Sequence, residues 1–130
     1  MRSVADKVLD SSTLIAFILG EPHGVDEDDI LADASISSVN LSEVIATLVL
    51  KGTPEELAIE TAGDFGLKVL PFDAKAAAIA GTLIAKAQPL NIGFGDCACI
   101  ATGMARGATI YTADRDWLKL GSDADIRLIR

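Results

Sequence analysis

The chain has 130 residues, a net charge of −8 and hydrophobic residues at 50% of its positions. The length favours one domain over residues 1–130, and the 5% of aromatic residues predicts an aliphatic core. The acidic balance excludes a generally basic nucleic-acid binder, but it leaves open nucleic acid that is reached through a bound metal ion and a few local cations.

Short apolar runs alternate with helical patterns along the chain. Strands are expected at residues 7–10, 35–39, 68–71, 109–112 and 127–129. Helices are expected at residues 13–19, 26–33, 40–51, 53–65, 73–87 and 96–106, with a short helical turn at residues 117–118. This alternation predicts an α/β fold with three layers, α/β/α, around a short central parallel sheet of four to five strands.

Several helix starts carry capping signals. Ser11 or Ser12 is placed to cap the first helix, and Asn40 the third. Thr53 and Glu56 have the spacing of a capping box, and Asp73 is a candidate cap for the alanine-rich helix that follows it.

Four acids stand where the chain changes from strand or loop to helix: Asp10, Glu43, Asp96 and Asp114. Each has a purely local explanation, as a helix cap, a capping-box partner, a first-turn acid or a turn residue. Together they point to a shared site, because an α/β sheet gathers its ligands at the carboxyl ends of the strands. Several carboxylates that meet there repel one another unless a cation lies between them.

Carboxylate oxygens are the ligands of hard cations such as Mg²⁺ and Mn²⁺, which pair naturally with phosphate. Such a site needs no histidine base, and the only histidine, His23, reads as an ordinary surface residue.

Cys97 and Cys99 are two residues apart and so point to different faces of a helix, which favours plain buried thiols. Gly93 and Gly95 lack the G-K-[ST] ending of a phosphate-binding loop and read as turn glycines.

Four blocks, in order, resemble the acidic blocks of PIN-domain ribonucleases, most closely the VapC-like toxins of bacterial toxin–antitoxin pairs. The blocks are V-L-D-S-S ending at Ser12, N-L-S-E-V ending at Val44, G-D-C-A-C-I-A ending at Ala101, and T-A-D ending at Asp114. The resemblance covers nearly the whole chain. Many relatives carry a basic residue directly after the third acid, where this chain has Cys97.

The resemblance implies a metal-dependent endoribonuclease in which Asp10, Glu43, Asp96 and Asp114 bind Mg²⁺ or Mn²⁺ and are catalytic. Water activated by the ion would attack a phosphate of RNA in line and leave a 5′-phosphate and a 3′-hydroxyl. Auxiliary roles are expected for three residues: Asp116, Thr112 and Ser12. Candidate contacts to the RNA backbone are Arg115, Lys119, Lys51 and Arg106.

The resemblance also implies two protein partners, a cognate antitoxin that blocks the cleft and a second copy in a homodimer. Two other functions stay open: a non-catalytic PIN-like binding module, and an aspartate-based phosphatase or phospho-acceptor domain that uses Asp10. Against the second, Ser12 stands where such phosphatases need an acid.

Residues 1–7 contain no apolar signal segment, and no apolar run approaches the ~20 residues that span a bilayer, so we expect an intracellular, cytoplasmic protein.

Overall fold

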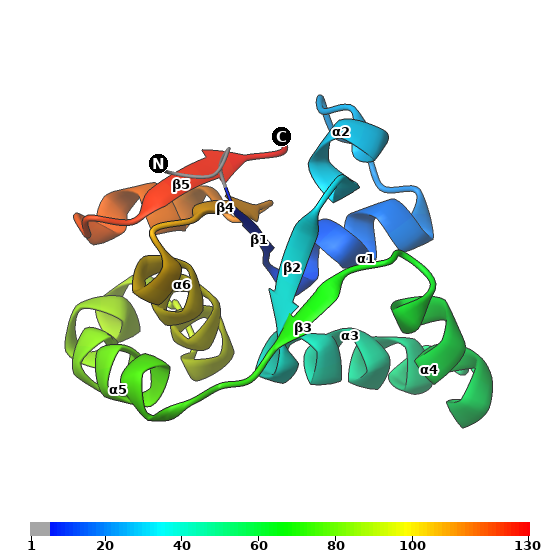
Figure 1. Ribbon diagram of the computed structural model, residues 1–130, viewed down its shortest axis with the longest axis horizontal. Coiled ribbons are helices and arrows are strands. Elements are labelled where there is room, and N and C mark those ends of the chain that lie inside the picture. The colour runs from blue at the N-terminus through cyan, green and yellow to red at the C-terminus, as the bar shows by residue number, and fades with distance from the viewer. Residues whose placement is uncertain (1–5) are drawn as a thin grey trace.

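The computed structural model describes residues 6–130. The expectation that the first residues carry no signal segment concerns mainly residues 1–5, which lie outside the described residues. The five strands are β1 (Lys7–Leu9), β2 (Ala34–Ser37), β3 (Lys68–Leu70), β4 (Thr109–Thr112) and β5 (Asp125–Leu128). They form one sheet in the order β3-β2-β1-β4-β5, and all four neighbouring pairs are parallel. The predicted parallel sheet is therefore confirmed, with β1 at its centre (Figure 1).

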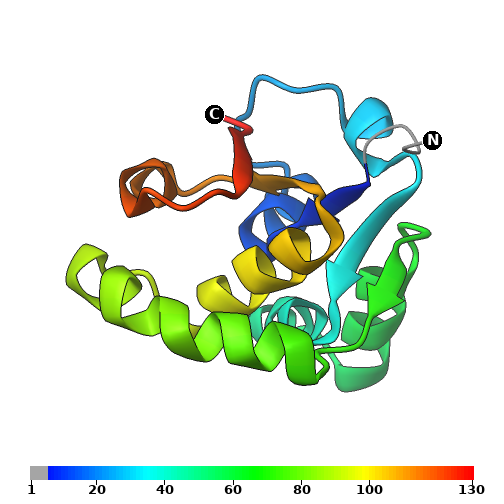
Figure 2. The same ribbon diagram turned by 60° about the vertical axis from the view of Figure 1, so that its left-hand side comes forward.

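Helices cover both faces of this sheet, which confirms the three-layer architecture (Figure 2). They are α1 (Ser11–Leu19), α2 (Glu27–Leu31), α3 (Ser38–Leu50), α4 (Glu55–Gly63), α5 (Ala74–Ala87) and α6 (Phe94–Arg106), with two 3₁₀ helices, η1 (Gln88–Leu90) and η2 (Arg115–Leu120). Among residues 6–130, no helix has the length and apolar character that crossing a membrane requires.

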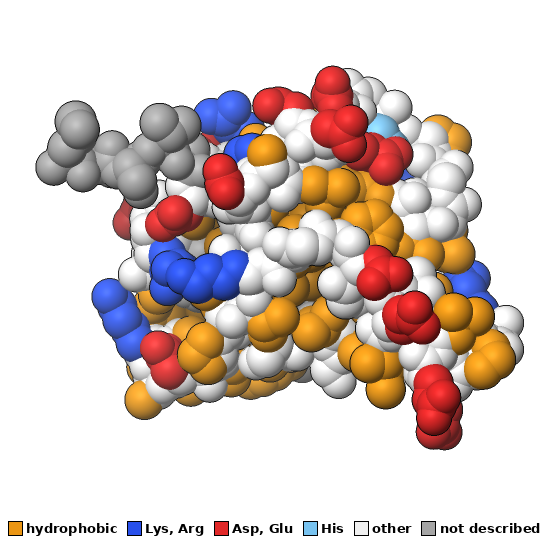
Figure 3. All heavy atoms as spheres, turned by 45° about the vertical axis from the view of Figure 1, so that its right-hand side comes forward, with side chains coloured by type: hydrophobic (Ala, Val, Ile, Leu, Met, Phe, Trp, Pro, Cys, Tyr) orange, Lys and Arg blue, Asp and Glu red, His pale blue; other side chains and the backbone are white. Residues whose placement is uncertain are grey.

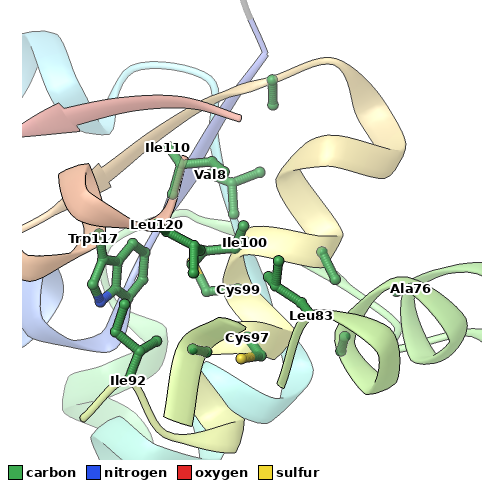
Figure 4. Packing of buried hydrophobic residues seen from close by; sticks show 14 of the residues in the cluster. Val8, Ala76, Leu83, Ile92, Cys97, Cys99, Ile100, Ile110, Trp117 and Leu120 are labelled. Atoms are coloured by element: carbon green, nitrogen blue, oxygen red, sulfur yellow. The ribbon is translucent and has the colours of Figure 1, made fainter. Parts of the chain in front are cut away.

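Alternation along the strands divides the core between the two faces. Val8 packs with α5, α6 and Trp117, whereas its neighbour Leu9 packs with α1 and α2 on the other face. The α5–α6 side is filled by aliphatic side chains and the two cysteines around Trp117 (Figure 4). Cys97 and Cys99 are both free and buried, as the sequence predicted.

Three predicted caps are wrong. Helix α1 begins at Ser11 and has Asp10 at its N-cap position, so neither Ser11 nor Ser12 is its cap. The third helix begins at Ser38, and the side chain of Ser37 accepts a hydrogen bond from the backbone N–H of Val39. Asn40 therefore lies inside the first turn of α3 and is not its cap. Helix α4 has Pro54 at its N-cap position and no side-chain cap, so Thr53 forms no capping box. The predicted cap Asp73 is confirmed, since it accepts from the N–H of Ala76.

Helix α6 packs tightly against β4 through a glycine. A Cβ atom on Gly103 would overlap Cγ1 and Cδ1 of Ile110, which is fully buried. Helix and strand can approach this closely only because position 103 has no side chain. This close contact fixes α6, which carries Asp96, against the centre of the sheet.

We expect Gly103→Ala to lower the free energy of unfolding by about 1–3 kcal/mol, because the added methyl group forces Ile110 out of its place. Gly81→Ala is the matched control on α5. Open space surrounds Gly81, so its replacement should stabilise the protein by about 0.5–1 kcal/mol through helix propensity. Urea unfolding of both variants measures the difference. Equal stabilisation by both substitutions would show that the contact between Gly103 and Ile110 is loose.

Candidate metal centre

Asp10 lies at the carboxyl end of the central strand and is only 2% exposed. Its Oδ2 accepts hydrogen bonds from Ser12 Oγ (2.6 Å) and from Thr112 Oγ1 (3.1 Å). Its Oδ1 is buried and has no hydrogen-bond partner among the described residues. Burial is the largest cause that raises the pKa of Asp10 to about 7; the charges of Asp96 and Glu43 contribute to the rise, and the hydrogen bonds from Ser12 and Thr112 oppose it.

Glu43 lies in α3 and contacts residues of two other helices, α1 and α6. Its Oε1 accepts from Asn40 Nδ2 (2.8 Å) and from Ser11 Oγ of α1 (3.2 Å). Its carboxylate lies against Gly95 of α6: a Cβ atom there would lie 2.7 Å from Glu43 Cδ and would overlap Oε2. The space that Glu43 occupies therefore exists only because residue 95 is glycine.

Asp96 occupies the first turn of α6. Its Oδ2 accepts from the backbone N–H of Gly93, the N-cap residue, at 2.9 Å. Burial raises the pKa of Asp96 above its usual value, and the charges of Glu43 and Asp114 add to the rise, whereas the Gly93 N–H lowers it. Asp96 thus lies close enough to Glu43 and Asp114 for their charges to raise its pKa.

Asp114 follows β4 and is tied to Asp10 through one hydroxyl group. The buried Thr112 Oγ1 donates to Asp10 Oδ2 and accepts from the N–H of Asp114 (3.1 Å). Asp114 Oδ1 in turn accepts from the N–H of Asp116 (2.9 Å). The predicted auxiliary residues Ser12 and Thr112 are therefore both in contact with Asp10 or its neighbours.

The four acids share one arrangement of their oxygens. Each has one oxygen bonded to a hydroxyl, amide or backbone N–H group: Asp10 Oδ2, Glu43 Oε1, Asp96 Oδ2 and Asp114 Oδ1. No protein donor within residues 6–130 contacts the second oxygen of any of them, and none of the four forms an ion pair there. Their spare oxygens are donors of the kind that Mg²⁺ and Mn²⁺ prefer.

These carboxylates are not drawn together around a single point. Within the described chain, no group of three or more Asp, Glu, His or Cys side chains lies close enough to hold one metal ion. The charges of the four acids nevertheless act on one another, as the raised pKa values of Asp10 and Asp96 show. Mutual repulsion favours such an open arrangement of like charges.

The predicted basic contacts divide into two groups. Arg115 and Lys119 lie in η2, which follows Asp114 directly. Arg115 Nη1 donates to the backbone carbonyl of Arg130 (3.1 Å), and Lys119 Nζ forms an ion pair with Asp116 (3.0 Å). Both pairs are exposed at the surface, beside the fourth acid.

Lys51 and Arg106 lie at the far ends of the two helices that carry Glu43 and Asp96. The separations of eight and ten residues place them about 12 Å and about 15 Å along the helix axes from those acids, at ~1.5 Å per residue. The structure does not bring these two cations to the acids.

Three residues of the site were missed in the sequence. Asn40 was interpreted as a cap, Gly95 as a turn glycine and Ser11 as another possible cap, but each contacts Glu43. The i, i+3 spacing of Asn40 and Glu43, and a glycine directly before Asp96, were the available signals. His23 was also misjudged: it is mostly buried, bonds to Glu27 (2.9 Å) and packs edge-on against Phe17.

Comparison with solved structures gives full-length similarity at low sequence identity. DNA-bound VapBC from Salmonella typhimurium has 22% identity, covers 98% of this chain and 100% of its own, and has a TM-score of 0.78. VapBC2 from Rickettsia felis, bound to a promoter DNA fragment, has 20% identity, covers 94% and 97%, and has a TM-score of 0.74. VapBC-5 from Mycobacterium tuberculosis, a member of the VapBC family of toxin–antitoxin systems, has 23% identity, covers 98% and 99%, and has a TM-score of 0.66.

A search of curated proteins finds no match to this chain. The family model of the PIN domain matches residues 7–122. This span includes Asp10, Glu43, Asp96 and Asp114 and the strands β1 to β4. The chain therefore belongs to the PIN domain family.

Proposed function

We propose that this protein is a metal-dependent endoribonuclease, the toxin of a toxin–antitoxin pair, which hydrolyses phosphodiester bonds of RNA in the cytoplasm. One observation carries the proposal: four carboxylates from distant parts of the chain lie near enough for their charges to act on one another, and within residues 6–130 each keeps one oxygen free of protein donors. The membership in the PIN domain family and the similarity to VapBC structures support it.

The donor chemistry of these residues suits a hard divalent cation, which would draw together carboxylates that stand apart without it. The buried Oδ1 of Asp10 has no hydrogen-bond partner, a costly state that a cation would relieve. Asp10, Glu43, Asp96 and Asp114 would hold Mg²⁺ or Mn²⁺, and the bound ion would activate water and neutralise charge on the phosphate. The protein's own part is to orient these carboxylates, through the Ser12 and Thr112 hydroxyl groups at Asp10 and through the Gly93 N–H at Asp96.

A bound cation would also reduce the electrostatic repulsion between this protein and RNA. A chain with a net charge of −8 and four neighbouring acids repels the RNA backbone. Arg115 and Lys119, beside Asp114, are the basic residues best placed for phosphate contacts, although each already has a protein partner. We assign Lys51 and Arg106 no contact at the scissile phosphate, because they lie at the far helix ends.

Protein partners fit the surface of α3 and α4. Three large apolar side chains of these two segments are exposed, Leu50 (87%), Leu57 (50%) and Ile59 (58%). Figure 3 shows apolar and acidic side chains next to one another on the surface of the molecule. Such apolar exposure is typical of a protein-binding surface. We assign the cognate antitoxin and a second copy of the chain as partners, in keeping with the VapBC complexes that resemble this fold.

We expect the purified protein to cleave RNA with Mg²⁺ or Mn²⁺ and to stop when EDTA is added. Asp96→Asn should lower the cleavage rate at least about 100-fold, since even outer-shell partners of a metal are worth 10–100-fold. Glu60→Gln, on the exposed face of α4, is the charge-matched control and should cleave at the parent rate. A parent protein that neither binds Mn²⁺ nor cleaves RNA would favour a non-catalytic binding module.

The raised pKa of Asp10 predicts a pH effect on the metal-free protein. Unfolded Asp10 loses its proton near pH 3.8, but folded Asp10 keeps it to about pH 7. The free energy of unfolding should therefore fall as pH rises from about 4 to about 7, by on the order of 4 kcal/mol from this group. Asp10→Asn should remove that part of the fall, whereas Glu60→Gln should keep it. Urea unfolding in EDTA measures both, and identical pH profiles for Asp10→Asn and the parent would contradict the prediction.

The close approach of α6 to Glu43 predicts a position-specific effect of a single methyl group. Gly95→Ala should displace the Glu43 carboxylate and weaken Mn²⁺ binding about 10-fold or more, with folding retained because a flexible side chain can move. Gly93→Ala is the control, since its Cβ would make only an ordinary contact of 3.7 Å with Asp96 Oδ2. Calorimetric titration with Mn²⁺ compares the two, and equal affinities would refute the tight fit at position 95.

A further inference from the structure

Asn40 is a fully buried polar residue in the first turn of α3, at 0% exposure. Its Nδ2 donates twice: to Glu43 Oε1 on the same helix (2.8 Å) and to the backbone carbonyl of Gly95 on α6 (3.0 Å). The first acceptor belongs to one candidate metal ligand, and the second lies one residue before another, Asp96. Asn40 therefore connects the two helices that carry these acids.

The orientation of the amide follows from its partners. Both partners are acceptors, so the NH₂ group must face them, and the reversed amide would point an oxygen at a carboxylate and a carbonyl. Few side chains match this pair of acceptors. Aspartate has no donor when ionised, a hydroxyl group has one hydrogen on a shorter stem, and glutamine is one methylene too long for a position without free volume.

This arrangement has a cost for the fold. Asn40 Oδ1 is buried and has no hydrogen-bond partner among residues 6–130. An unpaired buried acceptor destabilises a protein by about 1–3 kcal/mol. An apolar side chain of similar size would avoid that cost, so the two N–H donors are the feature that an asparagine offers at this position.

The two donors act on the geometry of the site. Together with Ser11 Oγ, Asn40 occupies Glu43 Oε1, so that Oε2 is the oxygen left without a donor, against Gly95. The bond to the Gly95 carbonyl holds the first turn of α6 at a set distance from α3. The separation of Glu43 from Asp96 is thereby fixed before any ligand binds.

We propose that Asn40 is a positioning residue of the metal centre, which orients the Glu43 carboxylate and sets its spacing from Asp96. The inference rests on the proposed function, because the carboxylates are the ligands that it positions. It gives Asn40 no contact with RNA or with the reacting phosphate. Its effect is on metal affinity and on the rate of the chemical step.

The test compares Asn40→Ala and Asn40→Val with the parent protein by calorimetric titration with Mn²⁺, alongside RNA cleavage. We expect the dissociation constant for Mn²⁺ to rise 10–100-fold and kcat to fall, with KM for RNA little changed. Valine fills more of the vacated volume than alanine, so the comparison of the two variants separates the loss of the N–H donors from the loss of volume. Val44→Ala is the control: it removes core volume from the next turn position of α3 but no donor to Glu43, and it should lower Tm without changing Mn²⁺ affinity.

A double-mutant cycle tests whether Asn40 acts through Glu43. In a Glu43→Ala background, Asn40→Ala should change Mn²⁺ affinity less than 3-fold, because the carboxylate that it orients is gone. Unchanged Mn²⁺ affinity in the Asn40 variants, with only Tm lowered, would overturn this inference and leave the proposed function intact. A parent protein that takes up no Mn²⁺ would overturn both.

Discussion

Repulsion among neighbouring acidic side chains at the carboxyl edge of a parallel sheet is the constraint on which this structure depends. Asp10, Glu43, Asp96 and Asp114 come from distant parts of the chain, the pKa values of Asp10 and Asp96 are raised, and within residues 6–130 no lysine or arginine pairs with any of the four. The groups that hold them are neutral: hydroxyls, one amide and backbone N–H groups. Such donors orient a carboxylate without cancelling its charge, so the attraction for a cation is preserved.

The fold was largely predictable because its signals are local and repeated. Alternating apolar strands and helices indicated a parallel three-layer architecture, and the order of elements in the structure agrees with it. Helix starts were less predictable. Ser37, Ser38 and Asn40 all favour cap positions within four residues, and only the end of β2 at Ser37 decides among them.

The site was predictable as a set of acids but not as a geometry. Residue type and position where a strand or loop gives way to a helix selected the four carboxylates, which stay proposed ligands, whereas closeness in the chain misled for Lys51 and Arg106. The two ends of a helix lie far apart, so a cation that follows an acid by two or more helical turns is distant from it. Contacts between helices, such as those of Asn40 and Gly95 with Glu43, depend on how α3 and α6 pack, which no local pattern reports.

The central place of β1 has a consequence for how the protein is made. β1 pairs with β2 on one side and β4 on the other, and the contact between Asp10 and Thr112 spans 102 residues. A ribosome completes β1 well before β4, so one edge of the middle strand stays unpaired until β4 has been made. The contact between Asp10 and Thr112 therefore cannot form on a chain that stops short of β4.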